Sequence, residues 1–315
     1  MAATALPRPA SETPERRLLR AGFGSLWILD AILQLQPGMF QMDMISDIMQ
    51  PAATGQPGWL AGSIHSSIAL VTPHLFAFNV AVVLLQAAIG VALLSARPRW
   101  VRAGAMGSIA WSALVWWFGE GLGQLLTGSA TLLAGAPGSV LLYGVTGVML
   151  LLPPREPRGE PGPTPASLAA AAVLALGAVL QANPLFFTPM GLSSPFGQME
   201  MMTQPRVIEN TLGWAVSAAS SAPVAVNAAL IAGAGALALA LALRPASAST
   251  AALASVFLFV VWWFGQDVGG LFTGMATDPN TSVPLAIWVW AGYLGARRPA
   301  LTVNPDRATL RPQMR

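Results

Sequence analysis

Long apolar runs alternate with short polar breaks along the whole chain. Each run is a candidate membrane-spanning helix, because a helix needs about 20 mostly apolar residues to cross the hydrocarbon core. Proline and glycine mark several of the ends, as at Pro37 and Gly38. Some runs are shorter than a standard span, so tilt or local thinning of the bilayer has to make up the difference. The pattern predicts eight helices, at residues 21–36, 74–96, 101–119, 138–152, 166–183, 223–243, 250–265 and 284–296.

One fourteen-residue element occurs twice. Residues 115–128 read VWWFGEGLGQLLTG, and residues 261–274 read VWWFGQDVGGLFTG, with nine identical positions and an offset of 261 − 115 = 146. Two adjacent tryptophans in the same frame as Phe-Gly and Thr-Gly argue against chance, and self-similarity at a fixed offset indicates duplication. Further matching pairs lie at offsets of 147 or 148, namely Gln34 and Gln181, Pro37 and Pro184, Phe40 and Phe187, and Asn79 and Asn227.

The two observations together predict an all-α, polytopic membrane protein with eight transmembrane helices arranged as two parallel four-helix repeats. We expect a cytoplasmic tail, a first repeat, a Pro-rich cytoplasmic linker, a second repeat and a second cytoplasmic tail. Their expected bounds are 1–20, 21–152, 153–165, 166–296 and 297–315. Residues 120–137 are rich in glycine and nearly uncharged, so we expect them to dip into the membrane with protein around them.

Arginine orients the predicted helices, since every basic residue of the chain is arginine. In the eight-span arrangement the clusters fall on one side, and only Arg206 lies on the other. The positive-inside rule places that side in the cytoplasm of a cell (inner) membrane, with both termini cytoplasmic. An even number of spans in each repeat makes the repeats parallel. The clusters are Arg16, Arg17 and Arg20; Arg97, Arg99 and Arg102; Arg155 and Arg158; Arg244; and Arg297 and Arg298.

Composition agrees with this class and excludes others. The chain is 54% hydrophobic and 9% charged, whereas about a quarter of the residues in a soluble domain are charged. The expected partner is therefore the lipid bilayer. The net charge of +3 comes from short arginine clusters between apolar runs, which is not typical of nucleic-acid binding. Cysteine is absent, which excludes disulfides, thiolate metal sites and cysteine nucleophiles.

A methionine-rich segment between the first two predicted helices is the first candidate site. Thioether and imidazole ligands favour copper among the common metals, so Met42, Asp43, Met44, His65 and His74 are candidate metal ligands. The alternative is that methionine serves as flexible apolar filler and that each histidine makes a hydrogen bond at a helix end. A similar methionine-rich segment recurs at 199–202, without histidine.

The duplicated element is the second candidate, because each copy keeps one acid beside its paired tryptophans. Glu120 follows Trp116 and Trp117, and Asp267 follows the second copy. Glu120 aligns with Gln266, so the two acids are one position apart. The alternative is an aromatic belt at the membrane interface with glycines that allow close helix packing.

Asp30 is the third candidate, because it lies inside the first predicted helix. It precedes Pro37 by seven residues, which places it about 10 Å below the helix end. A carboxyl group at that depth is costly unless it is protonated or paired, which favours a functional role. The alternative is a hydrogen bond to a neighbouring helix. The counterpart of Asp30 at an offset of 147 is Gly177. We predict that Asp30, Glu120 and at least one of the two histidines line one outward-opening cavity under a methionine-rich lid.

The first predicted helix with its flanks, LLRAGFGSLWILDAILQL, and the four-helix layout of each half resemble DoxX-type four-helix membrane proteins. The resemblance implies a membrane-protein partner subunit in sulfur-linked or quinone-linked redox chemistry, and it assigns no residue roles. The leading hypothesis is binding or handling of a small ligand or metal ion, copper first, at an outward-facing site. The alternatives are a DoxX-like subunit of a membrane oxidoreductase, and a structural partner or small-solute carrier. Catalytic activity stays open.

Overall fold

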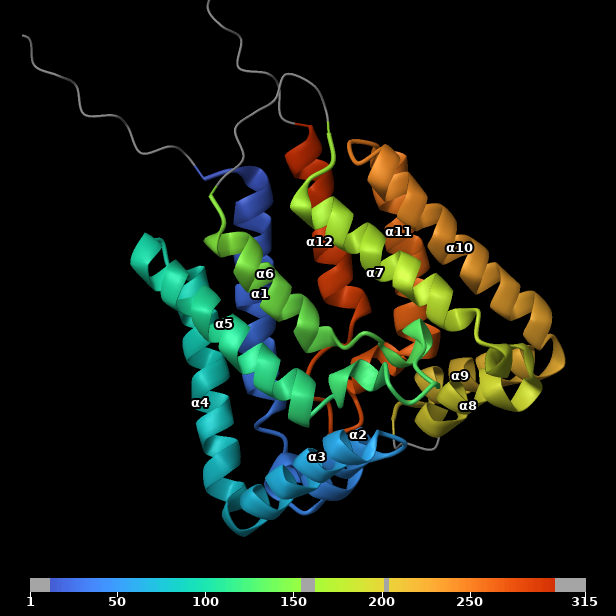
Figure 1. Ribbon diagram of the computed structural model, residues 1–315, viewed down its shortest axis with the longest axis horizontal. Helices are drawn as coiled ribbons and strands as arrows, with labels where there is room; N and C mark the ends of the chain where they lie inside the picture. Colours follow the sequence, from blue (N-terminus) through green and yellow to red (C-terminus); the bar gives the residue numbers. More distant parts are fainter. Residues whose placement is uncertain (1–11, 154–161, 201–203, 298–315) are drawn as a thin grey trace, which may run out of the picture.

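The computed structural model describes residues 12–153, 162–200 and 204–297, and within these it contains helices and turns but no strand (Figure 1). Eight long helices run between two ends of the molecule. In the first half (residues 12–153) they are α1 (Pro14–Leu33), α4 (Leu75–Leu94), α5 (Pro98–Phe118) and α6 (Ser139–Leu151). In the second half (residues 162–297) they are α7 (Pro165–Gln181), α10 (Pro223–Leu243), α11 (Ala248–Val260) with a π-helical turn at Val261–Gly265, and α12 (Ser282–Ala296).

Among the described residues, three helical segments are long and apolar enough to cross a membrane, which supports the assignment as a membrane protein. They are Gly58–Leu94, Pro223–Leu243 and Ala248–Gly265. The first of these bends at Thr72–His74, a short 3-10 turn that contains Pro73. The other long helices are shorter or carry charged residues near their ends.

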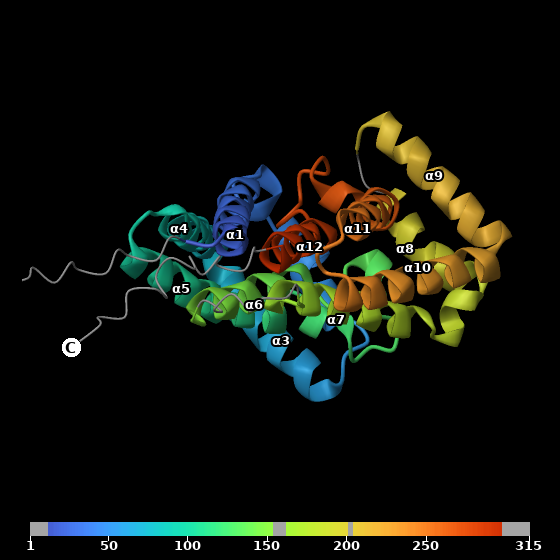
Figure 2. The same cartoon turned by 90° about the horizontal axis from the view of Figure 1, so that it is seen from above.

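Four further helices form the end of the molecule opposite to the start of α1. They are α2 (Gln50–Ala53), α3 (Gly58–Val71), α8 (Pro189–Glu200) and α9 (Arg206–Ser221). Seen from above, α3 and α9 project on opposite sides of the molecule (Figure 2). Neither helix is among the eight predicted from the sequence. The helical signal was present, because Leu60, Ile64 and Val71 are buried in α3 and the same spacing of buried residues occurs in α9.

The first helix begins earlier than the predicted residue 21, inside the segment expected as a tail. The helix begins at Pro14, where proline suits the first turn because its missing N–H group has no helical partner there. The hydroxyl group of Thr13 accepts a hydrogen bond from the amide of Arg16 and caps the helix. Residues 1–11, 154–161 and 298–315 of the expected tails and linker lie outside the described residues.

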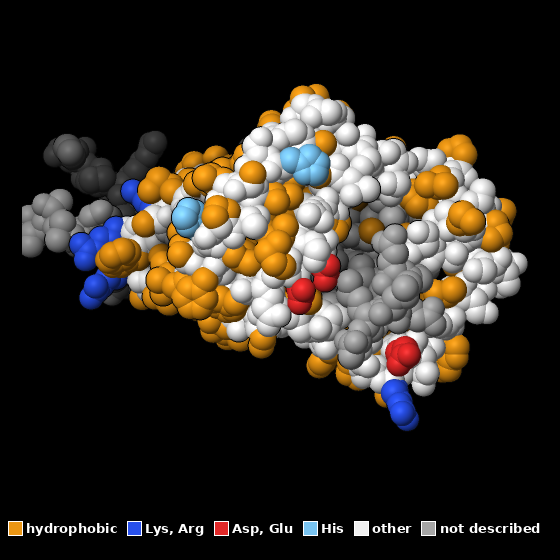
Figure 3. All heavy atoms as spheres, turned by 90° about the horizontal axis from the view of Figure 1, so that it is seen from below, with side chains coloured by type: hydrophobic (Ala, Val, Ile, Leu, Met, Phe, Trp, Pro, Cys, Tyr) orange, Lys and Arg blue, Asp and Glu red, His pale blue; other side chains and the backbone are white. Residues whose placement is uncertain are grey.

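The arginines of the described helices gather at the end where α1 begins and α12 ends (Figure 1). They belong to the first turns of α1, to the α4–α5 and α10–α11 connections, and to the residue after α12. Arg206, at the start of α9, lies at the opposite end. The face seen from below, at that opposite end, carries few charged side chains (Figure 3).

Pairs of side-chain hydrogen bonds recur at matching positions in the two halves. In the first half, the Gln34 side chain donates to Asn79 Oδ1, and Asn79 Nδ2 donates to the carbonyl of Gln34 at 3.0 Å. In the second half, Gln181 Nε2 donates to Asn227 Oδ1 at 2.7 Å, and Asn227 Nδ2 donates to the carbonyl of Gln181 at 3.0 Å. Each pair joins the end of one long helix to the next one, α1 to α4 and α7 to α10.

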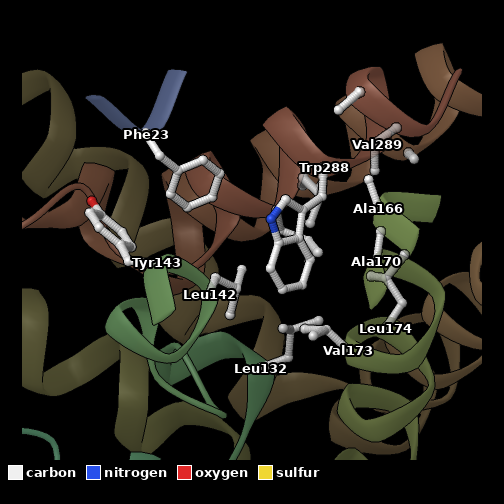
Figure 4. Packing of buried hydrophobic residues seen from close by; sticks show 14 of the residues in the cluster. Phe23, Leu132, Leu142, Tyr143, Ala166, Ala170, Val173, Leu174, Trp288 and Val289 are labelled. Atoms are coloured by element: carbon white, nitrogen blue, oxygen red, sulfur yellow. The ribbon is translucent and has the colours of Figure 1, made fainter. Parts of the chain in front are cut away.

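The halves meet around Trp288 of α12, whose side chain is 1% exposed. Figure 4 shows its indole between Phe23 of α1, Leu142 of α6 and the alanines of α7. The indole Nε1 donates to Thr146 Oγ1 of α6 at 2.7 Å. Trp288 thus fixes α12 against helices of both halves.

Residues 120–137, expected to dip into the membrane, form an irregular segment that is largely surrounded by protein. Leu132 and Leu133 are buried, and Leu132 packs against Gly177 of α7 in the other half. The matching segment before α12 brings Asp278 to the first half. Each half therefore places part of its last loop against the helices of the other.

Candidate functional site

A cavity of about 730 Å³ lies in the first half, between α1, α3, α4, α5 and α6. Its volume falls within the range of small-molecule sites. Most of its wall is apolar or aromatic, and the aromatic residues are Trp27, Phe78, Trp111, Phe118 and Tyr143. Polar or ionisable side chains also line it, among them Asp30, Gln34, Gln86, Glu120, Ser139 and Asp278.

Asp30 comes from the middle of α1 and is 2% exposed. The hydroxyl group of Tyr143 on α6 donates to Asp30 Oδ1 over 3.3 Å, and the same tyrosine ring packs edge-on against Trp27 at 4.8 Å between centroids. Trp27 precedes Asp30 by one helical turn and Gln34 follows it by one turn, so the three side chains share the face of α1 that lines the cavity.

Glu120 follows α5 and caps the start of α6. Its Oε1 atom accepts hydrogen bonds from Ser139 Oγ at 3.0 Å and from the Val140 amide at 3.2 Å. A carboxyl group at a helix N-terminus satisfies amides that have no helical acceptor. The second oxygen, Oε2, is buried and has no hydrogen-bond partner.

Asp278 is half-buried and comes from the second half, in the loop before α12. Its Oδ1 atom accepts from the Asn280 amide at 2.7 Å, and its Oδ2 atom accepts from Thr277 Oγ1 at 3.1 Å. Glu120 and Asp278 lie outside the long helices. Burial raises the pKa of Glu120 to about 8, and the Asp278 carboxyl adds to that increase. Burial also raises the pKa of Asp278.

In the part of the chain that the structure describes, these carboxyl groups have no positively charged partner. Within the described residues, no arginine forms an ion pair with Asp30, Glu120 or Asp278, and the ion pair found there joins Arg20 to Glu12. A buried carboxylate without a counter-charge is strongly disfavoured. The acids of this site are therefore neutral unless something else supplies positive charge.

Polar atoms without partners also line the cavity. Gln86 on α4 is 7% exposed, and its Oε1 atom accepts no hydrogen bond. The indole Nε1 of Trp111 on α5 and Glu120 Oε2 are likewise buried and unpaired. Buried polar groups are normally hydrogen-bonded, so unpaired ones that face a cavity indicate a site for water or a ligand.

The cavity reaches the molecular surface on one side and adjoins a second cavity on the other. On one side it is lined by Leu70, which is 73% exposed, and by the exposed Leu114, on the outer faces of α3 and α5. On the other side lies a second, more polar cavity of about 1280 Å³ between the end segments of the two halves. Glu120, Ser139 and Asp278 line both cavities.

The positions that match the three acids in the other half are uncharged. Asp30 corresponds to Gly177 and Glu120 to Gln266, by the offsets of 147 and 146. Asp278 corresponds to Ala136, because Pro279 and Pro137, which follow them, each accept a hydrogen bond from the tryptophan of the duplicated element. Gln266 Oε1 accepts from the Ser282 amide at 3.0 Å, as Glu120 does at α6, and Gln266 Nε2 donates to the carbonyl of Leu132 at 3.0 Å. The capping geometry is therefore shared, and the capping residue is an acid only in the first half.

The structure brings only some of the proposed site residues together. Asp30 and Glu120 line one cavity, whereas Asp267, Trp116 and Trp117 do not line it. Asp267 is buried in the second half. Trp116 and Trp117 instead donate their indole N–H groups to the carbonyl of Pro137 and to Ser63 Oγ.

The candidate copper ligands are dispersed. Met44 lines the cavity, whereas Met42 and Asp43 are exposed. His65 and His74 are also exposed and line neither cavity, so the expectation that one of them joins Asp30 and Glu120 is not met. Figure 3 shows the histidines at two separate places on one face. Among the described residues, no group of three or more His, Asp or Glu side chains could hold a metal ion.

Sequence reasoning missed Tyr143, Gln86 and Asp278 as members of the site. Tyr143 is one of two tyrosines in the chain, and Gln86 is an isolated polar residue in an apolar helix, which is a usable signal. Asp278 carried no such signal, because it reaches the cavity from the other half.

In comparisons with known proteins, no family model, no curated protein and no solved structure matches the chain. The resemblance to DoxX-type proteins therefore stays a prediction.

Proposed function

We propose that the chain is an eight-span membrane protein of two parallel four-helix repeats, and that its first repeat binds a small lipophilic organic molecule. The recurring Gln–Asn pairs support the duplication, as do the equivalent caps formed by Glu120 and Gln266. The two copies then differ in their cavities, which indicates that one copy was specialised for binding and the other kept for the scaffold.

The gathering of arginines at one end of the helices supports an orientation with both termini in the cytoplasm. α6 has only 13 residues, or about 20 Å, so part of the depth of the membrane has to be filled by the loops around residues 120–138. Irregular backbone at that depth is tolerated because protein surrounds it.

Reporter fusions test this orientation. A fluorescent protein fused after residue 160, or at the C-terminus, is expected to be active in the cytoplasm. Alkaline phosphatase inserted after Gly55, in the exposed turn between α2 and α3, is expected to be active outside. Phosphatase activity from a fusion after residue 160 would contradict the eight-span arrangement.

The observation that carries the binding function is the apolar cavity with unpaired polar atoms in its wall. Exposed leucines line it at the surface of α3 and α5, so a molecule dissolved in the bilayer has a direct way in. The buried, unpaired Gln86 supplies a hydrogen-bond acceptor inside. The larger polar cavity lies at the end of the molecule opposite to the arginines. In the proposed orientation this end faces outside, so the site faces outside as well.

Filling the cavity is expected to remove binding. Val82 of α4 is buried in the cavity wall, so Val82→Trp occupies space that a ligand needs. The probes are tetraphenylphosphonium, tetraphenylborate and triphenylphosphine oxide, which share phenyl groups and differ in charge. At least one of them should bind to purified protein in lipid nanodiscs, above protein-free discs, and should fail to bind Val82→Trp.

Two matched variants make the result specific. Val82→Leu introduces the residue found at the equivalent position 230 and should keep binding. Leu239→Trp adds a tryptophan on the exposed surface of α10 and should also keep it. If none of the three probes binds wild type, or if Val82→Trp binds as wild type does, the proposed function is refuted.

A further inference from the structure

We propose that the ligand is a lipophilic organic cation, taken up in exchange for a proton from the carboxyl groups of Asp30, Glu120 and Asp278. This inference rests on the proposed binding function and names its ligand class. It starts from the charge of the cavity, which contains three acids and no protein cation within the described residues. Because the protein supplies no positive charge to these acids, a ligand that pairs with them has to carry it.

The walls favour an organic cation over a metal ion. The three carboxyl groups line one cavity, yet they do not form a group that could hold a single metal ion. The ligand therefore has to be large enough to fill the space between them. Five aromatic side chains line the same cavity, and aromatic faces attract organic cations such as quaternary ammonium groups. The unpaired Gln86 Oε1 provides a further acceptor.

The second half indicates the protonation state of the empty site. At the position of Glu120 it has Gln266, which accepts one hydrogen bond at the start of α12 and donates another to the Leu132 carbonyl. A protonated Glu120 has the same pattern of one acceptor and one donor as glutamine. The cap is thus compatible with a neutral side chain at this position. The raised pKa of Glu120 agrees with a protonated, neutral carboxyl group.

All groups that face the exchanging carboxyls are acidic or neutral. α1 contributes Asp30, α6 contributes Tyr143, and the loops after α5 and before α12 contribute Glu120 and Asp278. α3 and α4 contribute serines and Gln86 and no charged residue. The adjoining polar cavity contains one further acid, Asp47. Among the residues that the structure describes, neither cavity is lined by a histidine or an arginine that competes for the proton.

The two cavities separate the routes of ligand and proton. The cation enters where exposed leucines line the apolar cavity, and the proton leaves through the polar cavity, which Glu120 and Asp278 also line. In the exchange, the O–H bond of one carboxyl group breaks, the proton passes to water, and the carboxylate pairs with the cation. Charge balances, and no oxidant or reductant takes part.

Tetraphenylphosphonium is the decisive probe, because its charge is permanent and any proton released on binding has to come from the protein. Its binding to wild type in nanodiscs is measured with an ion-selective electrode. Proton release is measured by calorimetry in two buffers of different ionisation enthalpy. Binding should be at least tenfold tighter than that of tetraphenylborate and triphenylphosphine oxide.

The pH dependence has a defined sign. The free site holds its proton below the pKa of Glu120, about 8, and the bound cation lowers that pKa. The affinity should therefore rise with pH, by up to tenfold per pH unit for one proton, from about pH 6 to about pH 8 and then level off. Proton release should be greatest, approaching one per cation, between about pH 6 and about pH 7, and should fall on either side of that window.

Glu120→Gln introduces the residue of the second half, so the fold should tolerate it. It should weaken tetraphenylphosphonium binding at least tenfold and flatten its pH dependence, while thermal unfolding stays near that of wild type. Asp267→Asn, which changes a buried acid outside the cavity, is the matched control and should bind as wild type does.

Equal binding of the anionic or neutral probe, or cation binding without proton release, would overturn this inference. Either result would leave the proposed binding function intact. Failure of all three probes would instead refute the binding function itself.

Discussion

Trp288→Ala is expected to lower the free energy of unfolding by about 3–5 kcal/mol. The indole is enclosed by α1, α6 and α7 (Figure 4), and its removal leaves a cavity where the two halves meet. The hydrogen bond from its Nε1 atom to Thr146 Oγ1 is lost as well. Unfolding by sodium dodecyl sulfate in mixed micelles, followed by circular dichroism, measures the change.

Two variants identify the cause of this loss. Trp288→Phe keeps a ring in the same space and loses the hydrogen bond, so it should cost less than Trp288→Ala. Trp290→Ala removes a tryptophan from the same helix that is 38% exposed and bonded to Ser255. It should cost about 1 kcal/mol or less. If Trp288→Ala costs no more than Trp290→Ala, the packing around Trp288 is not what joins the halves.

The alternation of apolar and polar residues predicted the long helices well, because helices of this length are specified by local composition. The bounds of α10 agree with the expected residues 223–243. The start of α1 was missed because Arg16, Arg17 and Arg20 were assigned to a cytoplasmic tail. In the structure, Leu19 is buried in the main core and extends the helix toward its capped start at Thr13.

The helices α3 and α9 were missed for a different reason. Neither segment was among the eight predicted helices, since each lies next to a methionine-rich segment and is flanked by proline. The decisive property is burial at a helical spacing, with Ile208 and Leu212 covered in α9 as Leu60 and Ile64 are in α3. That pattern is readable from the sequence only once the two segments are aligned with each other.

For the site, sequence reasoning could find the acids that come from the first half. Asp30 and Glu120 stand out because ionisable residues are rare in apolar surroundings. It could not find Asp278, which is 278 − 30 = 248 positions from Asp30 and reaches the cavity through contact between the halves. Long-range contacts of this kind are a property of the packing, and no local pattern encodes them.

The duplicated tryptophan element has a structural explanation that the sequence did not provide. Trp116 Nε1 donates to the Pro137 carbonyl at 2.8 Å, and Trp262 Nε1 donates to the Pro279 carbonyl at 2.8 Å. Each indole ties the end of a long helix to the loop that leads into the last helix of its half. The repeated residues thus hold the irregular loops in shape, and the binding cavity lies beside them.

Two equivalent glycines in this element are expected to be among the most sensitive positions of the chain. Gly123 has φ of +63°, and Gly269 has φ of +71°, a left-handed conformation that costs other residues about 1–2 kcal/mol. A Cβ atom on Gly123 would lie 1.9 Å from the Pro137 carbonyl oxygen, and one on Gly269 would lie 2.6 Å from the Pro279 carbonyl carbon. Backbone that is held by a tryptophan hydrogen bond has to move in both cases.

Gly123→Ala and Gly269→Ala should therefore each lower the free energy of unfolding by about 3 kcal/mol or more, the sum of conformational strain and overpacking. The element supplies its own controls in Gly128 and Gly274, where φ is +77° and +81° and no atom lies within 4 Å of an added Cβ. Alanine there should cost about 1–2 kcal/mol, from conformation alone. The difference between the two pairs, measured by the same detergent unfolding, isolates the steric contact with the proline carbonyl groups. Equal losses at all four glycines would show that this contact does not constrain the loops, and a large loss in only one half would contradict their equivalence.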